Sequence, residues 1–301
     1  MTIRNHSKVC LIISGCLILA AVVLSVCGLG INQGIDFKGG QSIQFALEEA
    51  GDTKTILDIT SAAGITDAAV TVQGVGNDQA IIRIPSGDDL EAVRERLIEG
   101  ITATYPNARF EGITAVSGTF STTLISNAVR SVLIAAALML IYIAIRFDLN
   151  SGLAAVFGLL HDVAMMLAFM VFLRSVIQMN STFIAAMLTI VGYSINNTIV
   201  IFDRIRENAK KYVTDSRVTI VNRSIRECLG RTINTTLTTL VTIVLLYIMG
   251  VDSIREFALP IIVGIVSGVY SANMINGYVW AWLMDRRDIR RGRKPVVTEE
   301  A

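Results

Sequence analysis

The sequence predicts a polytopic α-helical membrane protein with six spanning helices and one α+β domain outside the membrane. Of its 301 residues, 52% are hydrophobic, which is more than the core of one soluble domain of this size requires. The apolar residues gather in stretches long enough to cross about 30 Å of hydrocarbon as helices. Between the first two of these stretches lies a long segment with both helical and strand periodicity.

Six stretches are apolar enough to span a membrane, and charged residues are confined largely to their ends. They cover residues 9–29, 129–145, 152–173, 182–202, 233–249 and 258–284. Arg4 and Lys8 precede the first stretch as they would in a signal peptide, but this stretch is too long for one. Residues 24–27 read Leu-Ser-Val-Cys, which has a bulky valine where a lipoprotein cleavage site needs a small residue. We therefore interpret the first stretch as an uncleaved anchor.

Basic residues predict that both chain ends lie in the cytoplasm, because short basic loops stay on that side of the membrane. Arg4 and Lys8 precede the first span, and a basic tail follows the sixth. The predicted loop 203–232, between the fourth and fifth spans, is also basic. We interpret these charges as topological signals and expect no nucleic-acid partner. The predicted division is a cytoplasmic N-terminus at 1–8, a first span at 9–29, an external domain at 30–127, a five-helix membrane domain at 128–284 and a cytoplasmic tail at 285–301.

The external segment 30–127 is acidic and has the pattern of a small α+β domain. Strand periodicity is found at residues 42–47, 69–73, 80–84 and 109–116. Helical spacing predicts one helix at 54–63 and a second that carries Leu90, Val93, Leu97 and Ile101 on its apolar face. Asp88 or Asp89 can cap the second helix, and Gly76-Asn77-Asp78 supplies hairpin turn residues. The order β-α-β-β-α-β is that of a ferredoxin-like unit. With no cysteine, histidine or phosphate-binding loop, this domain is expected to bind or to transmit movement.

Asp162 lies beside His161 near the middle of the third span, where a carboxyl cannot readily extend to water. An acid at this depth indicates ion or proton transfer. The alternative is a structural hydrogen bond between helices, with the carboxyl protonated or paired. His161 is expected to form hydrogen bonds, since no metal-ligand spacing accompanies it.

The last three spans carry polar or small residues that are costly in contact with lipid. In the fourth span these residues are expected to face protein, and they are Gly192, Ser194, Asn196, Asn197 and Thr198. In the fifth span a polar stripe is predicted to enter the bundle, because one helical face carries Arg231, Thr235, Thr238 and Thr242. In the sixth span Gly264 and Gly268 form a GxxxG pair that favours close helix packing. Cross-links there can come from Ser267, Ser271, Asn273 and Asn276.

Four stretches of the sequence resemble the SecF family, the partner of SecD in the accessory complex of the Sec translocon. The sequence Gly-Ile-Asp-Phe-Lys-Gly-Gly at 34–40 is similar to the family's GIDF-x-GG signature, and His-Asp at 161–162 to its third-span pair. Residues 192–208 resemble the long fourth-span signature, and residues 231–236 the start of the fifth span. The residues that carry the resemblance include Gly34, Asp36, Phe37, Gly39, Gly40, His161, Asp162, Gly192, Tyr193, Ser194, Asn196, Asp203, Arg204 and Arg231.

The resemblance implies a subunit of the protein-export machinery in the bacterial cytoplasmic membrane. It implies half of a twelve-helix unit like the resistance-nodulation-division transporters, paired with a SecD homologue. The pair would use the proton or sodium gradient to draw preproteins across the lipid bilayer late in export. Further partners implied are the SecYEG channel, YajC and YidC. No enzyme activity and no cofactor beyond the coupling ion are expected, and no GxxxxGK[ST] motif for ATP hydrolysis occurs.

The sequence departs from the family pattern at Asn197, where the family has an aspartate that is assigned to ion transfer. An amide cannot titrate in the physiological range, although it can donate hydrogen bonds or coordinate sodium through its carbonyl oxygen. Arg231 matches an arginine assigned to the same relay and can lower the pKa of nearby carboxyls. We expect the acid of the partner to carry the ion, with Asn197 hydrogen-bonded to it, in preference to a sodium site here.

Three other functions are compatible with parts of the sequence. A half-size small-molecule exporter would share the fold but would need a substrate pocket in the external domain. An intramembrane hydrolase would use serine, histidine and aspartate, yet no GxSxG or HExxH motif is present. A non-conducting scaffold for SecD is the third alternative, and Asn197 favours it.

Overall fold

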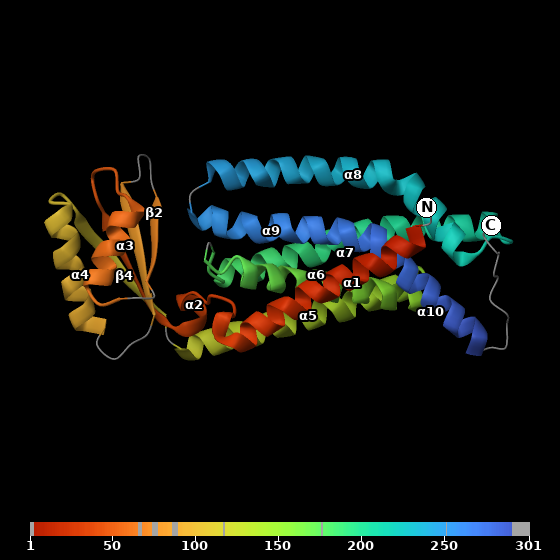
Figure 1. Ribbon diagram of the computed structural model, residues 1–301, viewed down its shortest axis with the longest axis horizontal. Coiled ribbons are helices and arrows are strands. Elements are labelled where there is room, and N and C mark those ends of the chain that lie inside the picture. Colours follow the sequence, from red (N-terminus) through yellow and green to blue (C-terminus); the bar gives the residue numbers. More distant parts are fainter. Residues whose placement is uncertain are drawn as a thin grey trace.

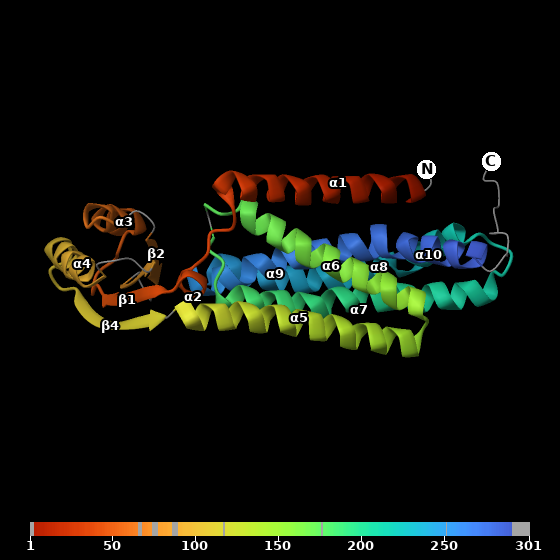
Figure 2. The ribbon, with the colours of Figure 1, turned by 90° about the horizontal axis from the view of Figure 1, so that it is seen from below.

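The computed structural model places a small sheet domain at one end of a bundle of long helices (Figures 1 and 2). It describes residues 3–65, 68–73, 78–85, 90–116, 118–175, 177–250 and 252–290. Within these residues, six helices are long and apolar enough to cross a membrane, as the sequence predicted. The chain is therefore a polytopic helical membrane protein.

The bundle is built around α7, which packs against α5, α6, α8 and α9. Its helices are α1 (Ile3–Leu24), α5 (Gly118–Arg146), α6 (Leu149–Phe172), α7 (Ser181–Lys211), α8 (Arg217–Met249), α9 (Asp252–Ser271) and α10 (Gly277–Arg290). Buried side chains such as Phe183, Ile190 and Ile265 fill the contacts between α7 and its neighbours. The start of α1 and the whole of α10 lie at the end of the bundle remote from the sheet domain (Figure 1).

Three features of the helices were not predicted from the sequence. The first span ends at Leu29 as predicted, but α1 ends at Leu24 and the last turn of the span, Ser25–Leu29, is π-helical, with a φ of 83° at Gly28. The sixth span is interrupted by a second π-helical turn, Ala272–Asn276, after which α10 bends away from the bundle axis (Figure 1).

The third difference is the predicted cytoplasmic loop 203–232, which is largely helical. Helix α7 continues to Lys211, and α8 begins at Arg217 with the Ser216 hydroxyl accepting a hydrogen bond from the backbone N–H of Thr219 at 3.2 Å. The segment is charged but amphipathic, since Ile205 and Ile220 are buried between the two helices. Hydropathy identifies the part of a helix that lies in lipid, so it missed these extensions.

The segment predicted to lie outside the membrane, called the external domain below, contains a four-stranded antiparallel sheet in the order β2-β3-β1-β4. Its elements are α2 (Ile35–Lys38), β1 (Gly40–Ala46), α3 (Thr53–Ala62), β2 (Ala69–Gln73), β3 (Gln79–Pro85), α4 (Leu90–Thr104) and β4 (Arg109–Val116). Apart from the short α2, this is the predicted order of elements. The predicted turn at Gly76 and Asn77, the predicted caps Asp88 and Asp89, and tail residues 291–301 lie outside the described residues.

The core of the external domain joins one face of the sheet to α3 and α4. It includes Phe45 and Ile82 from the sheet and Ile56, Leu97 and Ile101 from the helices, all fully buried. Helix α3 is capped by Asp52, whose carboxylate accepts hydrogen bonds from the Thr55 hydroxyl at 2.9 Å and from its N–H at 3.1 Å. These hydrogen bonds hold the pKa of Asp52 below its ordinary value.

The glycine-rich segment 34–40 fastens this domain to the bundle. The N–H of Gly34 donates to the carbonyl of Met179 at 2.8 Å, and the Asp36 carboxylate accepts from the N–H of Ser181 at 2.8 Å, at the first turn of α7. Gly39 and Gly40 have φ values of 76° and 149°, which L side chains rarely adopt. A Cβ atom on Gly40 would lie 2.1 Å from the carbonyl oxygen of Ile84 in β3. Gly40 therefore allows β1 to start directly against β3.

We expect Gly40→Ala to lower the thermal stability of the external domain, at a cost of about 2 kcal/mol or more, because the new Cβ collides with β3 backbone in a strained conformation. Gly112→Ala is the matched control in the same sheet, since nothing lies within 4 Å of its added Cβ. Limited proteolysis of each purified variant over a range of temperatures gives its melting temperature. Equal melting temperatures for the two variants would contradict this account of the glycine.

Candidate functional site

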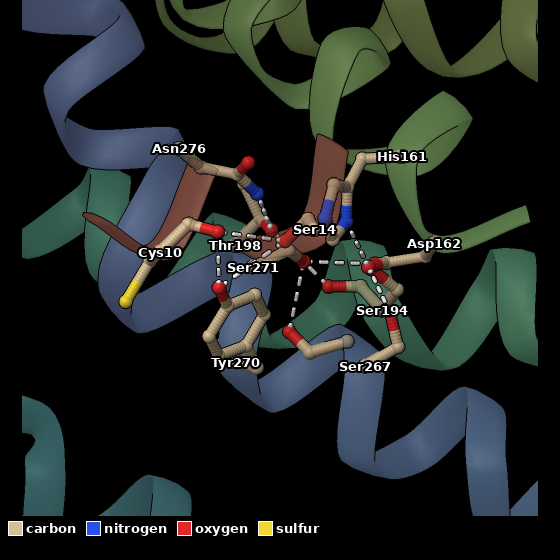
Figure 3. Close-up of polar contacts among 11 residues, drawn as sticks. Cys10, Ser14, His161, Asp162, Ser194, Thr198, Ser267, Tyr270, Ser271 and Asn276 are labelled. Atoms are coloured by element: carbon tan, nitrogen blue, oxygen red, sulfur yellow. Dashed lines mark hydrogen bonds and ion pairs between the residues drawn. The ribbon is translucent and has the colours of Figure 1, made fainter. Parts of the chain in front are cut away.

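The carboxylate of Asp162 is the centre of a buried polar cluster inside the bundle (Figure 3). Its side chain is fully buried in α6. Oδ1 accepts a hydrogen bond from Ser267 Oγ at 2.8 Å, and Oδ2 accepts from Ser194 Oγ at 2.5 Å and Ser271 Oγ at 2.8 Å. Nδ1 of His161 lies 3.1 Å from Oδ1. One carboxylate thus joins α6 to α7 and α9.

The number of donors around Asp162 matches what a buried carboxylate needs. An isolated ionised carboxylate in an apolar interior is very costly, and hydrogen bonds to both oxygens offset that cost. Three hydroxyl groups and one ring nitrogen direct four contacts to its two oxygens. The arrangement suits a structural anchor, and the Asp162 side chain has no exposed surface within the described part of the chain.

His161 extends the cluster towards α1. Its ring stacks on that of Tyr270, with centroids 6.0 Å apart and an interplanar angle of 30°. The Tyr270 hydroxyl donates to the backbone carbonyl of Cys10 at 2.6 Å and accepts from Ser14 Oγ at 3.1 Å. With Nδ1 as the donor to Asp162, Nε2 is an acceptor, and this buried atom finds no partner among the described residues.

The sequence did not single out Tyr270, Ser14 or Cys10. Ser14 and Cys10 are isolated polar groups in an apolar stretch, and no periodicity marks any of the three residues. What joins them is a contact between residues about 260 positions apart, which only the folded chain reveals. The signal that could have found Tyr270 is its place between Ser267 and Ser271, two residues that sequence analysis did name.

A second group of polar residues lies beside the first on the inner face of α7. Asn276 Nδ2 donates to Thr198 Oγ1 at 2.9 Å, and the side chain of Asn276 packs where a Cβ on Gly158 would lie. Asn197 is buried, and its Nδ2 has no hydrogen-bond acceptor within the described part of the chain. Asn196 instead lies on the exposed side of the helix. The two adjacent asparagines therefore belong to different surfaces.

The fifth-span stripe does not enter this chain's own bundle, so that prediction was wrong for the single chain. Arg231, Thr235, Thr238 and Thr242 are exposed along α8, while Thr232 and Thr236 face inward. Helical periodicity shows which residues share a face but not which side that face turns to. Thr238 and Thr242 donate to the carbonyls of Thr235 and Thr238 at 2.8 and 3.0 Å. Their hydroxyls therefore need no outside partner.

The remaining signature residues have structural contacts. Arg204 donates to Glu227 at 2.5 Å and to Glu207 at 2.6 Å, which ties α7 to α8 beyond the apolar part of the helices. Asp203 is exposed. Tyr193 packs against the cluster of apolar side chains between α7 and α9, and its hydroxyl is buried. Phe37 is buried in α2.

The two glycines of the sixth span bring α9 close to α7. A Cβ on Gly264 would lie 2.5 Å from Ile190 Cγ1, and one on Gly268 would lie 3.1 Å from Ser194 Cβ. The second contact is adjacent to the hydrogen bond between Ser194 and Asp162. Close packing at Gly268 therefore places Ser194 within reach of the carboxylate.

Comparison with known proteins identifies the family. Residues 97–286 match the family described as protein export membrane protein SecD/SecF, C-terminal, and residues 25–50 match the SecD/SecF GG motif. The protein translocase subunit SecF of Alicyclobacillus acidocaldarius is 36% identical over 90% of this chain and 89% of its own length. The subunit SecDF of Bacillus subtilis is 34% identical over 84% of this chain and 34% of its own length.

The fold agrees with that comparison. The crystal structure of SecDF from Thermus thermophilus, a translocon-associated membrane protein, matches 94% of this chain with a TM-score of 0.75 and 33% identity. The chain spans about two fifths of that SecDF chain, since 38% of it is covered. At these identities and coverages, the chain belongs to the SecF family of protein-export membrane proteins, which are multi-pass proteins of the bacterial cytoplasmic membrane.

Proposed function

We propose that this protein-export subunit pairs with a SecD homologue through the exposed faces of α7 and α8, and that the pair promotes late translocation of preproteins with a proton or sodium gradient. One observation carries the pairing: a row of polar and small residues lies exposed on helices that otherwise suit lipid. Gly192 and Asn196 of α7 and Arg231, Thr235 and Thr238 of α8 form this face. The amide of Asn196 and the guanidinium of Arg231 are costly in contact with lipid, so the face needs protein against it.

The chemistry of the face fits close helix packing. The hydroxyls of Thr238, Thr239 and Thr242 donate to carbonyls of their own helix, so these small side chains present no unpaired donor to a partner helix. Arg231 has no carboxylate partner among the described residues. A membrane acid on the partner would supply one. The SecDF chains of Bacillus subtilis and Thermus thermophilus, which hold a region similar to this chain within a longer protein, support this pairing.

Thr238→Trp is expected to reduce co-purification with the SecD homologue at least about fivefold, because a large ring holds the two helix surfaces apart. Leu237→Trp is the matched control, since Leu237 is exposed on another side of α8. Affinity purification from mild detergent with quantitative mass spectrometry measures the ratio of the two proteins. An unchanged ratio for Thr238→Trp would exclude this face and would favour the exporter alternative.

For ion coupling, we infer that the partner's membrane acid carries the ion and that Asp162 holds the bundle together. Both oxygens of Asp162 are engaged by side chains of this chain's own helices, which favours a role in holding those helices together. Asn197 cannot titrate, and its buried Nδ2 lacks an acceptor within the described chain. It is available to a group or an ordered water that enters on assembly. No catalytic residue and no resident cofactor form part of this proposal.

We expect Asp162→Asn to retain gradient-dependent export within about threefold, because serine hydroxyls can rotate to accept from the new amide. Asp162→Leu should prevent stable assembly, since it leaves buried hydroxyls unpaired at about 1 to 3 kcal/mol for each. Export into inverted membrane vesicles, with and without an ionophore, tests Asp162→Asn. The thermal stability of the purified protein tests Asp162→Leu. If Asp162→Asn assembles normally but loses all gradient-dependent export, the ion path runs through this residue.

We further infer that the external domain is a ferredoxin-like module that binds the emerging preprotein or transmits movement. The order of its elements, its antiparallel sheet order and the packing of both helices in one core support the fold. Arg83 of β3 lies 3.3 Å from Glu256 of α9, and Asn180 Nδ2 donates to the same carboxylate at 2.5 Å. These contacts dock the sheet on the bundle. The SecYEG channel, YajC and YidC complete the proposed assembly.

The proposed orientation puts both chain ends and the turn between α7 and α8 in the cytoplasm. Basic residues at the bundle end remote from the sheet domain support it. In a variant whose native cysteines are replaced, Ala50→Cys should react with an impermeant maleimide in intact cells. Thr214→Cys, exposed in the turn between α7 and α8, should react after lysis. The reverse labelling pattern would invert the proposed topology.

A further inference from the structure

A small cavity lies at the end of the bundle remote from the sheet domain, outside the polar cluster around Asp162. Its volume is about 260 Å³. It is formed by the turn between α5 and α6, the last turns of α7, the first turn of α8, and α10. The lining residues that the argument uses are Phe147, Phe202, Trp280, Arg206, Lys210 and Arg217.

The cavity has an apolar floor and a basic rim. Phe202 and Trp280 are buried, with exposed fractions of 2% and 6%. Arg206 and Lys210 are exposed, and neither forms an ion pair within the described part of the chain. The one lining carboxylate, Asp148, already accepts a hydrogen bond from the N–H of Ser151 at 2.6 Å as the cap of α6. Arg206 and Lys210 outnumber this one carboxylate, so the rim keeps a net positive charge.

Other basic residues nearby do have acidic partners in the chain. Arg217 contacts Asp285 at 3.2 Å and also pairs with Asp288, and Arg223 lies 3.0 Å from Asp215. By contrast, the guanidinium groups of Arg146 and Arg206 both lie over the ring of Phe147, at 5.4 and 5.9 Å from its centroid. Arg206 also donates to the carbonyl of Arg146 at 3.1 Å. Two like charges held on one ring repel each other, and an anion beside them would relieve that repulsion.

The position of the cavity along the helices indicates that the anion belongs to an amphiphile. The apolar span of α5 ends at Arg146, and that of α6 begins at Leu149. Ile145 and Leu149, on either side of the turn, are exposed by 82% and 60%, as expected for contact with acyl chains. The volume is below the range of about 300 to 1,000 Å³ that encloses a drug-sized ligand. It suits a headgroup whose chains stay in the bilayer.

We propose that this cavity binds the headgroup of an anionic phospholipid of the leaflet that faces α10. Arg206 and Lys210 hold the phosphate, and the floor formed by Phe202 and Trp280 contacts the glycerol and the first methylene groups. The site goes beyond the export function and does not depend on the SecD pairing. Basic pockets between spanning helices are a recurrent way of recognising anionic headgroups.

The test uses the purified full chain, delipidated and titrated with phosphatidylglycerol or phosphatidylcholine of identical acyl chains, with bound lipid counted by native mass spectrometry. The unaltered chain should prefer phosphatidylglycerol. Arg206→Gln with Lys210→Gln should lower that preference at least about tenfold, since each cation near an anionic surface contributes a factor of about five. Lys211→Gln with Arg226→Gln is the control, because it removes equal charge from exposed positions outside the cavity. The control should stay within about twofold, and equal losses in both variants would overturn the proposal.

A second measurement needs no substitution and so cannot fail through misfolding. A phosphatidylglycerol analogue with a photoreactive group near its phosphate is irradiated with the unaltered chain, and the labelled peptides are mapped. Labels should fall within residues 147–151 and 202–210 and should be displaced by phosphatidylglycerol. Labels elsewhere would overturn the site. Equal displacement by millimolar glycerol 3-phosphate would overturn the lipid as its occupant and indicate a soluble phosphate ester.

Discussion

The carboxylate of Asp162 fixes the positions of three helices, and the interior of the bundle follows from it. In a membrane the polar groups of a helix must find partners within the protein, because the surrounding lipid offers none. Asp162 meets this condition by accepting hydrogen bonds from serines of α7 and α9. Those hydroxyls reach it because Gly268 lets α9 approach Ser194 closely. The close helix packing at Gly268 and the hydrogen bonds to Asp162 therefore depend on each other.

The same constraint explains where helices end and bend. Ser271 donates to Asp162 at the last residue of α9, and the π-helical turn Ala272–Asn276 follows at once. This turn points Asn276 towards Thr198 and into the space left by Gly158. Helix α10 then leaves the bundle axis (Figure 1). A regular helix through this region would give Asn276 a different direction, so the irregular turn serves the polar contacts.

Sequence reasoning predicted the parts of the structure that depend on local patterns. Six apolar stretches and the alternation in residues 42–116 were sufficient for the spans and for the order of elements in the external domain. Asp162 stood out because an acid deep in a span is costly. The serines around it were recognised as polar, but their common target was not, since it depends on the rotation of three helices about their axes. Tyr270 and its contact with Cys10 were missed for the same reason.

Where the prediction failed, the residue pattern was identified correctly, but the sequence did not show which parts of the protein pack against it. The residues of the α8 stripe do share one face of the helix, but among the described residues that face is exposed. Residues 203–211 and 217–232 extend α7 and α8 because Ile205 and Ile220 are buried in one apolar cluster, which charge and hydropathy do not report. The π-helical turn at the end of the first span was not predicted, because the positive φ of Gly28 is one that a glycine permits but does not require.

Helix α7 runs without a break from the sheet domain, through the middle of the bundle, to the opposite end of the bundle. Its 31 residues extend about 46 Å at 1.5 Å for each residue. At one end Asn180 and Ser181 contact Glu256 and Asp36. At the other end Asn208 donates to Glu227 at 2.8 Å. Because a helix without a proline or a break is stiff along its axis, these ends cannot shift independently. An axial displacement of α7 would therefore move the contacts at both of its ends together.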